Sequence, residues 1–383
     1  MHKVAFCTVL MGAIGFMPGH SPTAIAQSSE IANRIDEAVP SKPYAQPAQP
    51  RKMLVFTLTR GYRHESIAAG VHAFRILGEK TGAFEIVHSE DPAVFEPQRL
   101  IQFDAVCMLN TTGELFTPSN FEELEPAARS NAGRLARRWK QSLLDFVAGG
   151  GGLIGIHAAA DCFYKWSEYG DLMGGYFNGH PWHEEVTVIV EEPDHPLCAP
   201  FGATSFQITD EIYQIRSPYS RLRQRVLLSL DADRTDLRRS GIRRTDRDFA
   251  VSWVRTYGAG RVFYCSLGHR EEIYWNPAVL RHYLAGIQFA MGDLVADATP
   301  SIRRPGGGEA LFDGQTLAGW QGVVSNVKAR TDMSDEQLAA AQEVANKQMA
   351  EHWTVTDGVI RFDGEGESIA TIDDFGDIEL RVD

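Results

Sequence analysis

The stretch that decides the fold reads GGGLIGIHAAAD and spans residues 150–161. Its leading glycines precede the apolar run Leu153–Ile156, so they are expected to end a helix and not to form a phosphate-binding loop, which would follow a strand. The small residues after His157 permit a tight turn from strand to helix that holds one side chain out over the edge of a sheet. We therefore predict a buried strand that ends at His157, with Asp161 four residues further on and able to orient the imidazole.

Similar apolar runs alternate with helix-like segments on both sides of this stretch. The expected strands are Met53–Thr59, Phe84–His88, Ala105–Leu109, Leu153–Ile156, Val186–Val190, Arg225–Leu230, Ala250–Arg255 and Val262–Ser266, and the expected helices are Ser66–Glu79, Ala132–Ala148 and Ala278–Met291. Buried runs separated by helices are typical of a parallel sheet that is covered on both faces. The sequence therefore predicts an α/β domain over residues 52–292, with a mostly parallel sheet and helices on both faces.

Composition and charge exclude one class of partner. The 383 residues are 44% hydrophobic and 23% charged, which is ordinary for a globular protein. The 37 basic and 50 acidic residues give a net charge of −13, so the chain would repel nucleic-acid phosphates and no nucleic-acid partner is expected. The cysteines include no C-x-x-C pair and are interpreted as buried free thiols. The oligomeric state is left open.

The N-terminal segment, residues 1–26, has the three-part plan of a secretory signal peptide. Lys3 precedes the apolar run Val4–Met17, and the small residues Ala24 and Ala26 predict cleavage after Ala26. A membrane anchor is the weaker interpretation, because about 14 apolar residues cannot span a bilayer that needs about 20. We expect a periplasmic or secreted protein with no membrane insertion after the signal is removed.

Two segments have the composition of linkers. Residues 27–51 are polar and contain four prolines, which favour extended chain, and residues 293–309 contain two prolines and three successive glycines. A final region, residues 310–383, includes a helix-like stretch at Ser334–Ala350.

Polar side chains follow four of the expected strands. They are Arg63 and His64, Asn110 and Thr111, His157 and Asp161, and His269. The carboxyl ends of parallel strands meet at one edge of a sheet, where ligands collect, so we expect a shared pocket. In this pocket His64, His157 and Asp161 are candidate catalytic residues, and Arg63, Asn110, Thr111 and His269 are candidate substrate ligands.

A second group of polar residues lies further along the chain. His180 and His183 are candidate catalytic residues, because imidazoles transfer protons near neutral pH or bind divalent metals. No cofactor is certain, but a divalent metal could be held by His157, His180 and His183, although the spacing His180-x-x-His183 is not diagnostic of zinc. Asp210 and Glu211 stand beside an aromatic residue, as in many sugar sites, and a solvated turn fits them equally well.

Several separated motifs carry a resemblance to a known family. They read FTLTRGYRH at 56–64, LNTTG at 109–113, the opening stretch at 150–161, GHP at 179–181, DHP at 194–196 and GAGRVFYCSLGH at 258–269. Together they resemble the ThuA-like (trehalose utilisation) domain. This resemblance implies a fold similar to class I glutamine amidotransferases and a role in the metabolism of trehalose-like disaccharides and their 3-keto forms. His157 stands where those amidotransferases place a cysteine, so glutaminase activity is not expected.

The C-terminal region has a resemblance of its own. ALFDGQTLAGW at 310–320 and HWTVTDGVI at 352–360 resemble the opening of a 3-keto-disaccharide hydrolase domain. The resemblance implies part of an all-β, concanavalin-like sandwich, truncated within an alternating strand at 377–383.

These observations lead to one functional hypothesis and two alternatives. The hypothesis is an exported carbohydrate-active protein that cleaves glycosidic bonds of trehalose-like or 3-keto di- or oligosaccharides by acid/base catalysis at histidines. In this hypothesis Asp161 orients His157, and His180 or His183 assists. The first alternative is a non-catalytic sugar-binding module that serves the attached hydrolase domain, and the second is a metal-dependent hydrolase.

Overall fold

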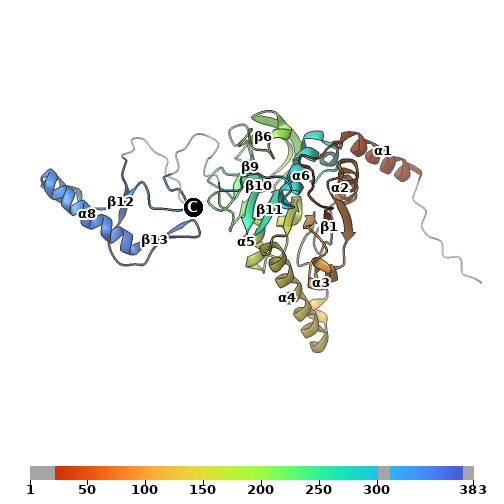
Figure 1. The fold of residues 1–383 in the computed structure, drawn as a ribbon, viewed down its shortest axis with the longest axis horizontal. Coiled ribbons are helices and arrows are strands. Elements are labelled where there is room, and N and C mark those ends of the chain that lie inside the picture. The colour runs from red at the N-terminus through yellow and green to blue at the C-terminus, as the bar shows by residue number, and fades with distance from the viewer. Residues whose placement is uncertain (1–21, 301–310, 374–383) are drawn as a thin grey trace, which may run out of the picture.

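A nine-stranded sheet organises the chain, of which the computed structural model describes residues 22–300 and 311–373 (Figure 1). The strand order is β2-β1-β3-β4-β11-β10-β9-β6-β7, formed by β1 (Lys52–Phe56), β2 (Glu85–Ser89), β3 (Ala105–Leu109), β4 (Gly152–Ile156), β6 (Trp182–Val190), β7 (Ser205–Ile212), β9 (Arg225–Leu230), β10 (Ala250–Tyr257) and β11 (Gly260–Cys265). The five strands from β2 to β11 are parallel, and each later strand is antiparallel to its neighbour. The predicted α/β fold with a mostly parallel central sheet is confirmed.

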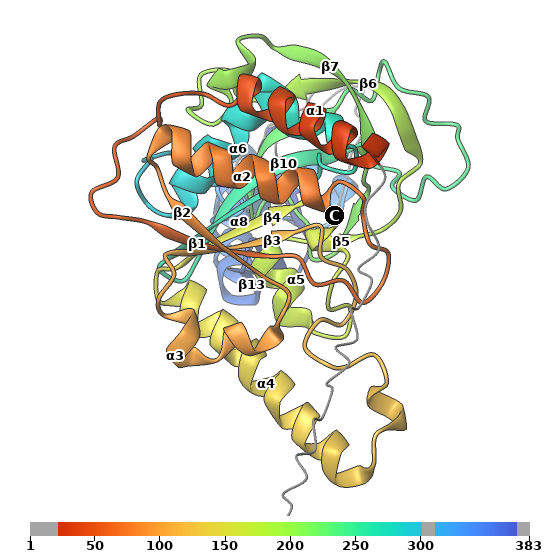
Figure 2. The ribbon, with the colours of Figure 1, turned by 90° about the vertical axis from the view of Figure 1, so that its right-hand side faces the viewer.

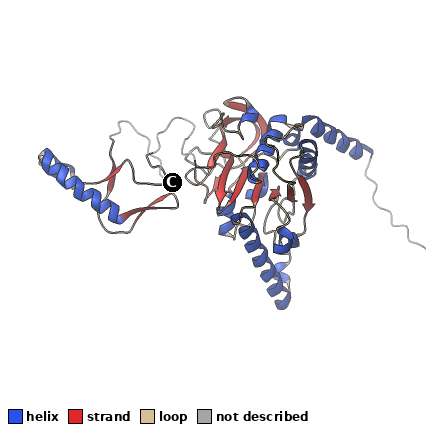
Figure 3. Ribbon diagram, in the orientation of Figure 1, coloured by secondary structure: helices blue, strands red, loops and turns tan. Residues whose placement is uncertain are grey.

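Helices cover both faces of the parallel strands (Figure 3). Alternate residues of β1 show the two faces, because Met53 packs into one hydrophobic cluster and Leu54 into the other. The first cluster includes α1 (Pro22–Ala38), α2 (Ile67–Thr81) and α6 (Pro277–Ala290), and the second includes α3 (Pro97–Leu100), α4 (Pro126–Ala148) and α5 (Ser167–Met173). Shorter elements of this domain are β5 (Tyr176–Phe177), β8 (Ile215–Arg216), η1 (Pro92–Phe95), η2 (Phe121–Glu123), η3 (His157–Ala160), η4 (Ala199–Phe201) and η5 (Glu271–Trp275).

The segment before β1 differs from the predicted linker. Residues 22–38 form α1, which lies beside α2 in Figure 2, and Ile35 is fully buried. Ile31, Ile35 and Val39 recur every four residues and so share one helix face, a pattern that the prolines further along obscure. Residues 40–51 form neither helix nor strand and contain several bends, and the side chain of Gln288 binds the backbone of Ala45 within them. The apolar run of the predicted signal peptide lies outside the described residues.

The C-terminal region contains α7 (Val327–Thr331), α8 (Asp335–His352) and two small antiparallel sheets, drawn in blue in Figure 1. One sheet pairs β12 (Trp320–Gly322) with β15 (Ile369–Thr371), and the other pairs β13 (Trp353–Thr356) with β14 (Val359–Phe362). The predicted helix is confirmed. The alternating strand predicted at 377–383 lies outside the described residues, and the hydrolase resemblance of this region stays a prediction.

Two further sequence predictions concern the described residues. Cys107, Cys162, Cys198 and Cys265 are buried and free, as expected. Among the helices of residues 22–300 and 311–373, none combines the length and the apolar character that a bilayer crossing requires.

Outside the strand-end pocket, His282 on α6 is fully buried and connects two segments of the core. Its Nδ1 lies 2.7 Å from the carbonyl oxygen of Leu197, and its Nε2 lies 2.9 Å from Oγ of Ser252. Burial lowers the pKa of His282 from 6.5 to about 4. Because the folded pKa is below the unfolded one, the neutral ring contributes stability that is fully present above pH 6.5 and is lost as the pH falls towards 4.

We therefore expect the change His282→Gln to flatten the pH dependence of stability. The wild-type chain should lose about 3 kcal/mol more than the variant between pH 6.5 and pH 4, as measured by urea unfolding. His72→Gln, on α2, is the matched control and should follow the wild-type profile. Parallel profiles for wild type and His282→Gln would show that this histidine does not couple folding to pH.

Candidate functional site

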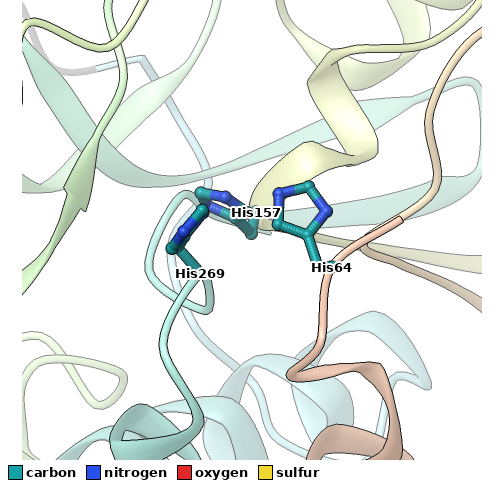
Figure 4. A group of neighbouring side chains, drawn as sticks. All are labelled: His64, His157 and His269. Carbon is teal, nitrogen blue, oxygen red and sulfur yellow. The ribbon is translucent and has the colours of Figure 1, made fainter. Parts of the chain in front are cut away.

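Three imidazoles from distant parts of the chain meet beyond the carboxyl ends of the parallel strands (Figure 4). His64 follows β1, His157 follows β4 and His269 follows β11. The ring centroid of His64 lies 4.8 Å from that of His157 and 5.1 Å from that of His269. The centroids of His157 and His269 are 5.3 Å apart. The structure thus brings together three of the histidines that sequence analysis placed at strand ends.

The backbone at His157 forms the tight turn that its sequence indicates. Its φ of 49° is left-handed, which is unusual for a residue with a side chain. Nδ1 lies 2.6 Å from the carbonyl oxygen of Ser266, which can only accept, so Nδ1 carries the proton and Nε2 holds a lone pair. The hydroxyl of Tyr213, 2.9 Å away, donates to Nε2. Burial, reinforced by His64, keeps the pKa of His157 well below 6.5.

The predicted partnership of Asp161 with His157 is wrong. Both ring nitrogens of His157 bind other groups, and the carboxylate of Asp161 accepts a hydrogen bond from the hydroxyl of Tyr164. The four-residue spacing does not bring the two side chains together, because η3 is a short 3₁₀ turn and not an α-helix. Burial raises the pKa of Asp161.

The carboxylate of Glu211 lies at the centre of the polar cluster. Its Oε1 is 3.5 Å from Nδ1 of His269 and 3.7 Å from Nε2 of His157. Its Oε2 is 3.3 Å from Nδ1 of His180 and 3.9 Å from Nδ1 of His183. One oxygen therefore faces the buried His157 and the partly buried His269, and the other faces two histidines whose side chains are 51% and 43% exposed.

The charges in this cluster shift two pKa values in opposite directions. Burial alone would raise the pKa of Glu211, but the surrounding imidazoles, His269 first, hold it below the ordinary value. Burial alone would lower the pKa of His269, but the Glu211 carboxylate outweighs burial and raises it. By contrast, burial lowers the pKa of His64 to about 4.

A curled ribbon carries Glu211 to the strand ends, although β7 is an edge strand of the sheet. β6 pairs with β9 only through Val188–Val190, whereas it pairs with β7 from Trp182 to Ile189. The first half of β6 and the last half of β7 therefore leave the sheet as a two-stranded ribbon, on which His183 lies opposite Glu211. The sequence shows two carboxylates before an aromatic residue here but gives no sign of the curl.

Asp210, predicted to bind substrate, instead anchors the loop that carries His269. Its buried carboxylate accepts hydrogen bonds from the backbone N–H of Gly268 at 2.7 Å and of Arg270 at 3.0 Å. Burial raises the pKa of Asp210 to about 6, against the opposing effect of these bonds. The same loop requires Gly268, whose φ is 134°.

Three other predicted substrate ligands have partners outside the imidazole cluster. Asn110 donates to Gly268 O at 3.0 Å and to Oγ of Ser66 at 2.9 Å, and therefore helps to hold the same loop. Thr111 is fully buried, and its hydroxyl lies 3.2 Å from the thiol of Cys162. Arg63 forms an exposed ion pair with Glu90 at 2.7 Å.

Sequence analysis also missed residues of the site. Tyr213 and Ser66 make the contacts described above, and Tyr62 packs edge-on against His64 with a centroid distance of 4.8 Å while 62% of its surface is exposed. The motif FTLTRGYRH contains Tyr62, so its position two residues before His64 was the available signal.

The structure changes the candidate metal ligands. The described residues contain two groupings whose ligand atoms lie within 4.8 Å of one another: His64, His157 and His269, and His183, Glu211 and His269. The predicted set of His157, His180 and His183 is not one of them, because the two exposed histidines lie on the Oε2 side of Glu211.

A cavity lies along the same ribbon, lined by residues outside the cluster. Its volume is about 420 Å³, and its lining includes Glu185, Thr209 and Arg270. On the ribbon, Glu185 lies opposite Thr209, two residues along from the pair of His183 and Glu211. Because side chains two residues apart in a strand point to the same face, both pairs are on one face of the ribbon. Arg270 directly follows His269. A ligand in this cavity would therefore contact residues that neighbour the cluster in the chain.

Comparison with known proteins gives the following matches. A ThuA-like protein of Bacteroides uniformis has a solved structure that shares 21% identity, covers 64% of this chain and 94% of its own, and superposes with a TM-score of 0.49. The solved structure of a ThuA-like protein of Parabacteroides merdae shares 18% identity, covers 64% of this chain and 92% of its own, and superposes with a TM-score of 0.44. No curated protein matches the chain.

The family assignment rests on a family model and not on these superpositions. The model for trehalose utilisation, ThuA, matches residues 52–136 and 128–290, which is more than half of the chain and includes every histidine of the cluster. The chain therefore belongs to the trehalose utilisation (ThuA) family.

Proposed function

We propose that the strand-end pocket binds and cleaves trehalose-like or 3-keto di- or oligosaccharides by acid/base catalysis. The observation that carries this proposal is the position of Glu211, whose carboxylate lies within 4 Å of four imidazoles at the edge of the sheet where ligands collect. The family assignment supports a carbohydrate substrate.

The chemistry of a 3-keto sugar fits a carboxylate base beside an imidazole acid. The ketone at C3 acidifies the hydrogen on C2, so Glu211 Oε2 takes this proton and the electron pair of the C2–H bond moves onto the ketone as an enolate. The enolate then collapses, so that the C1–C2 double bond forms as the C1–O bond breaks, and the departing oxygen receives a proton from His180. The products are an unsaturated keto sugar and an alcohol, and later addition of water to the first gives the hydrolysis product. No oxidant or reductant is needed.

The positions of the acid and the base suit this reaction. Nδ1 of His180 lies 3.3 Å from Oε2 of Glu211, so the two groups can serve neighbouring atoms of one sugar ring. His183 is the second exposed imidazole on this side and can assist. The exposed ring of Tyr62 and the adjoining cavity of about 420 Å³ offer contacts for the rest of the substrate.

The proposal includes export and a role without glutaminase activity. Cleavage after Ala26 would remove only the first residues of α1 and leave Ile31, Ile35 and Val39 to pack on the domain. The thiol of Cys162 is buried, and burial keeps its pKa well above the usual value, so a thiolate nucleophile is not available. The attached C-terminal region would then act on, or deliver, the same class of sugar.

A substrate panel tests the proposal. The full chain is incubated with 3-keto-trehalose, trehalose and 3-keto-maltose, and the released sugars are quantified by chromatography while binding is measured by calorimetry. We expect release of glucose from the 3-keto sugars and much slower release from trehalose, because only the ketone acidifies C2. Binding of these sugars without any release would instead support the non-catalytic sugar-binding module, and neither binding nor release would contradict both.

A further inference from the structure

We propose that His64, His157 and His269 bind one divalent transition metal ion of the zinc type. The three residues follow three different strands and present one ligand atom each within 4.8 Å of the others. Three imidazoles that leave a position open are the ligand set of many catalytic zinc sites. The inference concerns metal binding and does not depend on the proposed sugar chemistry.

The spacing of the polar atoms fits a cation better than it fits direct hydrogen bonds. Zinc bonds to nitrogen or oxygen of about 2.0 to 2.1 Å place neighbouring tetrahedral ligands about 3.3 Å apart. The ligand atoms of the three imidazoles lie within 4.8 Å of one another, and Glu211 Oε1, outside this set, lies 3.5 Å from Nδ1 of His269 and 3.7 Å from Nε2 of His157, which is too long for a good hydrogen bond. The carboxylate also adds negative charge beside the three imidazoles.

Unpartnered buried nitrogens give a second, independent reason. Nδ1 of His64 and Nδ1 of His269 are buried, and neither forms a hydrogen bond of good geometry with a described residue; Nδ1 of His269 faces Glu211 Oε1 at 3.5 Å. His64 as a whole is only 5% exposed, and Figure 4 shows its ring beside that of His157. A buried polar atom without a partner is costly, by about 1 to 3 kcal/mol, and a bound cation would supply the missing partner.

The environment of His157 has the arrangement expected of a metal ligand. Its Nδ1–H donates to the carbonyl oxygen of Ser266, which fixes the tautomer and leaves Nε2 as the ligand atom. The hydroxyl of Tyr213 now donates to this Nε2, so a metal on the same nitrogen would replace this hydrogen bond. Removal of that hydroxyl should therefore leave metal affinity unchanged or increase it.

The chemistry of the ligands selects the class of metal. Neutral imidazoles suit zinc, copper, iron, cobalt and nickel, whereas magnesium and calcium prefer sets made of oxygen atoms alone. We therefore expect Zn²⁺ and Co²⁺ to bind and Mg²⁺ and Ca²⁺ to bind weakly or not at all.

Calorimetric titration of the full chain with Zn²⁺, after removal of metals by a chelator, tests the inference. We expect one tight site per chain, an affinity about 100-fold or more lower in His64→Ala and His269→Ala, and an unchanged or higher affinity in Tyr213→Phe. His72→Ala, on α2 and outside the cluster, is the matched control and should bind as the parent does. Equal affinity in the parent and both ligand variants would overturn the site.

A spectroscopic measurement on the parent chain tests the same metal site without variants, which could fold poorly. X-ray absorption of the zinc-loaded protein should show three imidazole ligands at about 2.0 Å. Fewer than three imidazoles, or no retained zinc, would overturn the assignment whatever the sugar assays show.

Discussion

Replacement of Glu211 by glutamine should lower the turnover of 3-keto-trehalose by about 10² to 10⁴-fold, because the amide has the shape of the carboxylate but cannot accept the C2 proton. Oε2 lies between the two exposed imidazoles, and Oε1 faces those of His157 and His269. Sugar binding should change far less than turnover. Steady-state kinetics with measured kcat and KM, together with calorimetric binding, separate the two effects.

Glu184→Gln provides the matched control for this variant. Glu184 is on the same ribbon, but its side chain forms a surface ion pair with Arg239 at 2.7 Å. It should retain parental kcat. Because Glu211 also adjoins the proposed metal ligands, zinc content is measured in the same samples, and turnover is compared at equal zinc loading. Parental kcat in Glu211→Gln would exclude Glu211 as the base.

Replacement of Asp210 by alanine should destabilise the domain by about 3 kcal/mol or more and also impair the site. The change leaves the backbone N–H groups of Gly268 and Arg270 without their buried acceptor. It also releases the loop that places His269 beside Glu211. Urea unfolding measures the first effect, and kcat with zinc affinity measures the second.

The conservative variant shows whether Asp210 acts by position. Asp210→Asn keeps a side-chain oxygen that can accept one of the backbone hydrogen bonds, so it should recover part of both stability and kcat relative to Asp210→Ala. If alanine and asparagine gave equal losses, or if stability fell while His269-dependent zinc affinity stayed at the parental value, the assigned anchoring role would be wrong.

The sequence predicts the parallel half of the fold well because short-range patterns specify it. Among the parallel strands, β3 has the predicted bounds, and β1, β4 and β11 differ from prediction by a few residues at their ends. His64, His157 and His269 each follow a buried apolar run, so their convergence follows from the parallel order of the strands.

The carboxylate at the centre of the site could not be placed in the same way. Glu211 reaches the imidazoles only because the ribbon of β6 and β7 curls away from β9, which depends on tertiary packing. The tautomer of His157 likewise depends on Ser266 and Tyr213, which are far away in the chain. A local four-residue spacing therefore suggested Asp161 as the partner of His157, and that suggestion was wrong.

The most direct test of the central claim is to follow 3-keto-trehalose by NMR in deuterated water with the full chain and with Glu211→Gln. We predict that the parent chain releases glucose, with exchange of the C2 hydrogen for deuterium in substrate or product, and that the variant loses both signals in parallel. No glucose release by the zinc-loaded parent, or release that Glu211→Gln leaves unchanged, would contradict the assignment of Glu211 as the base of a 3-keto-sugar cleavage site.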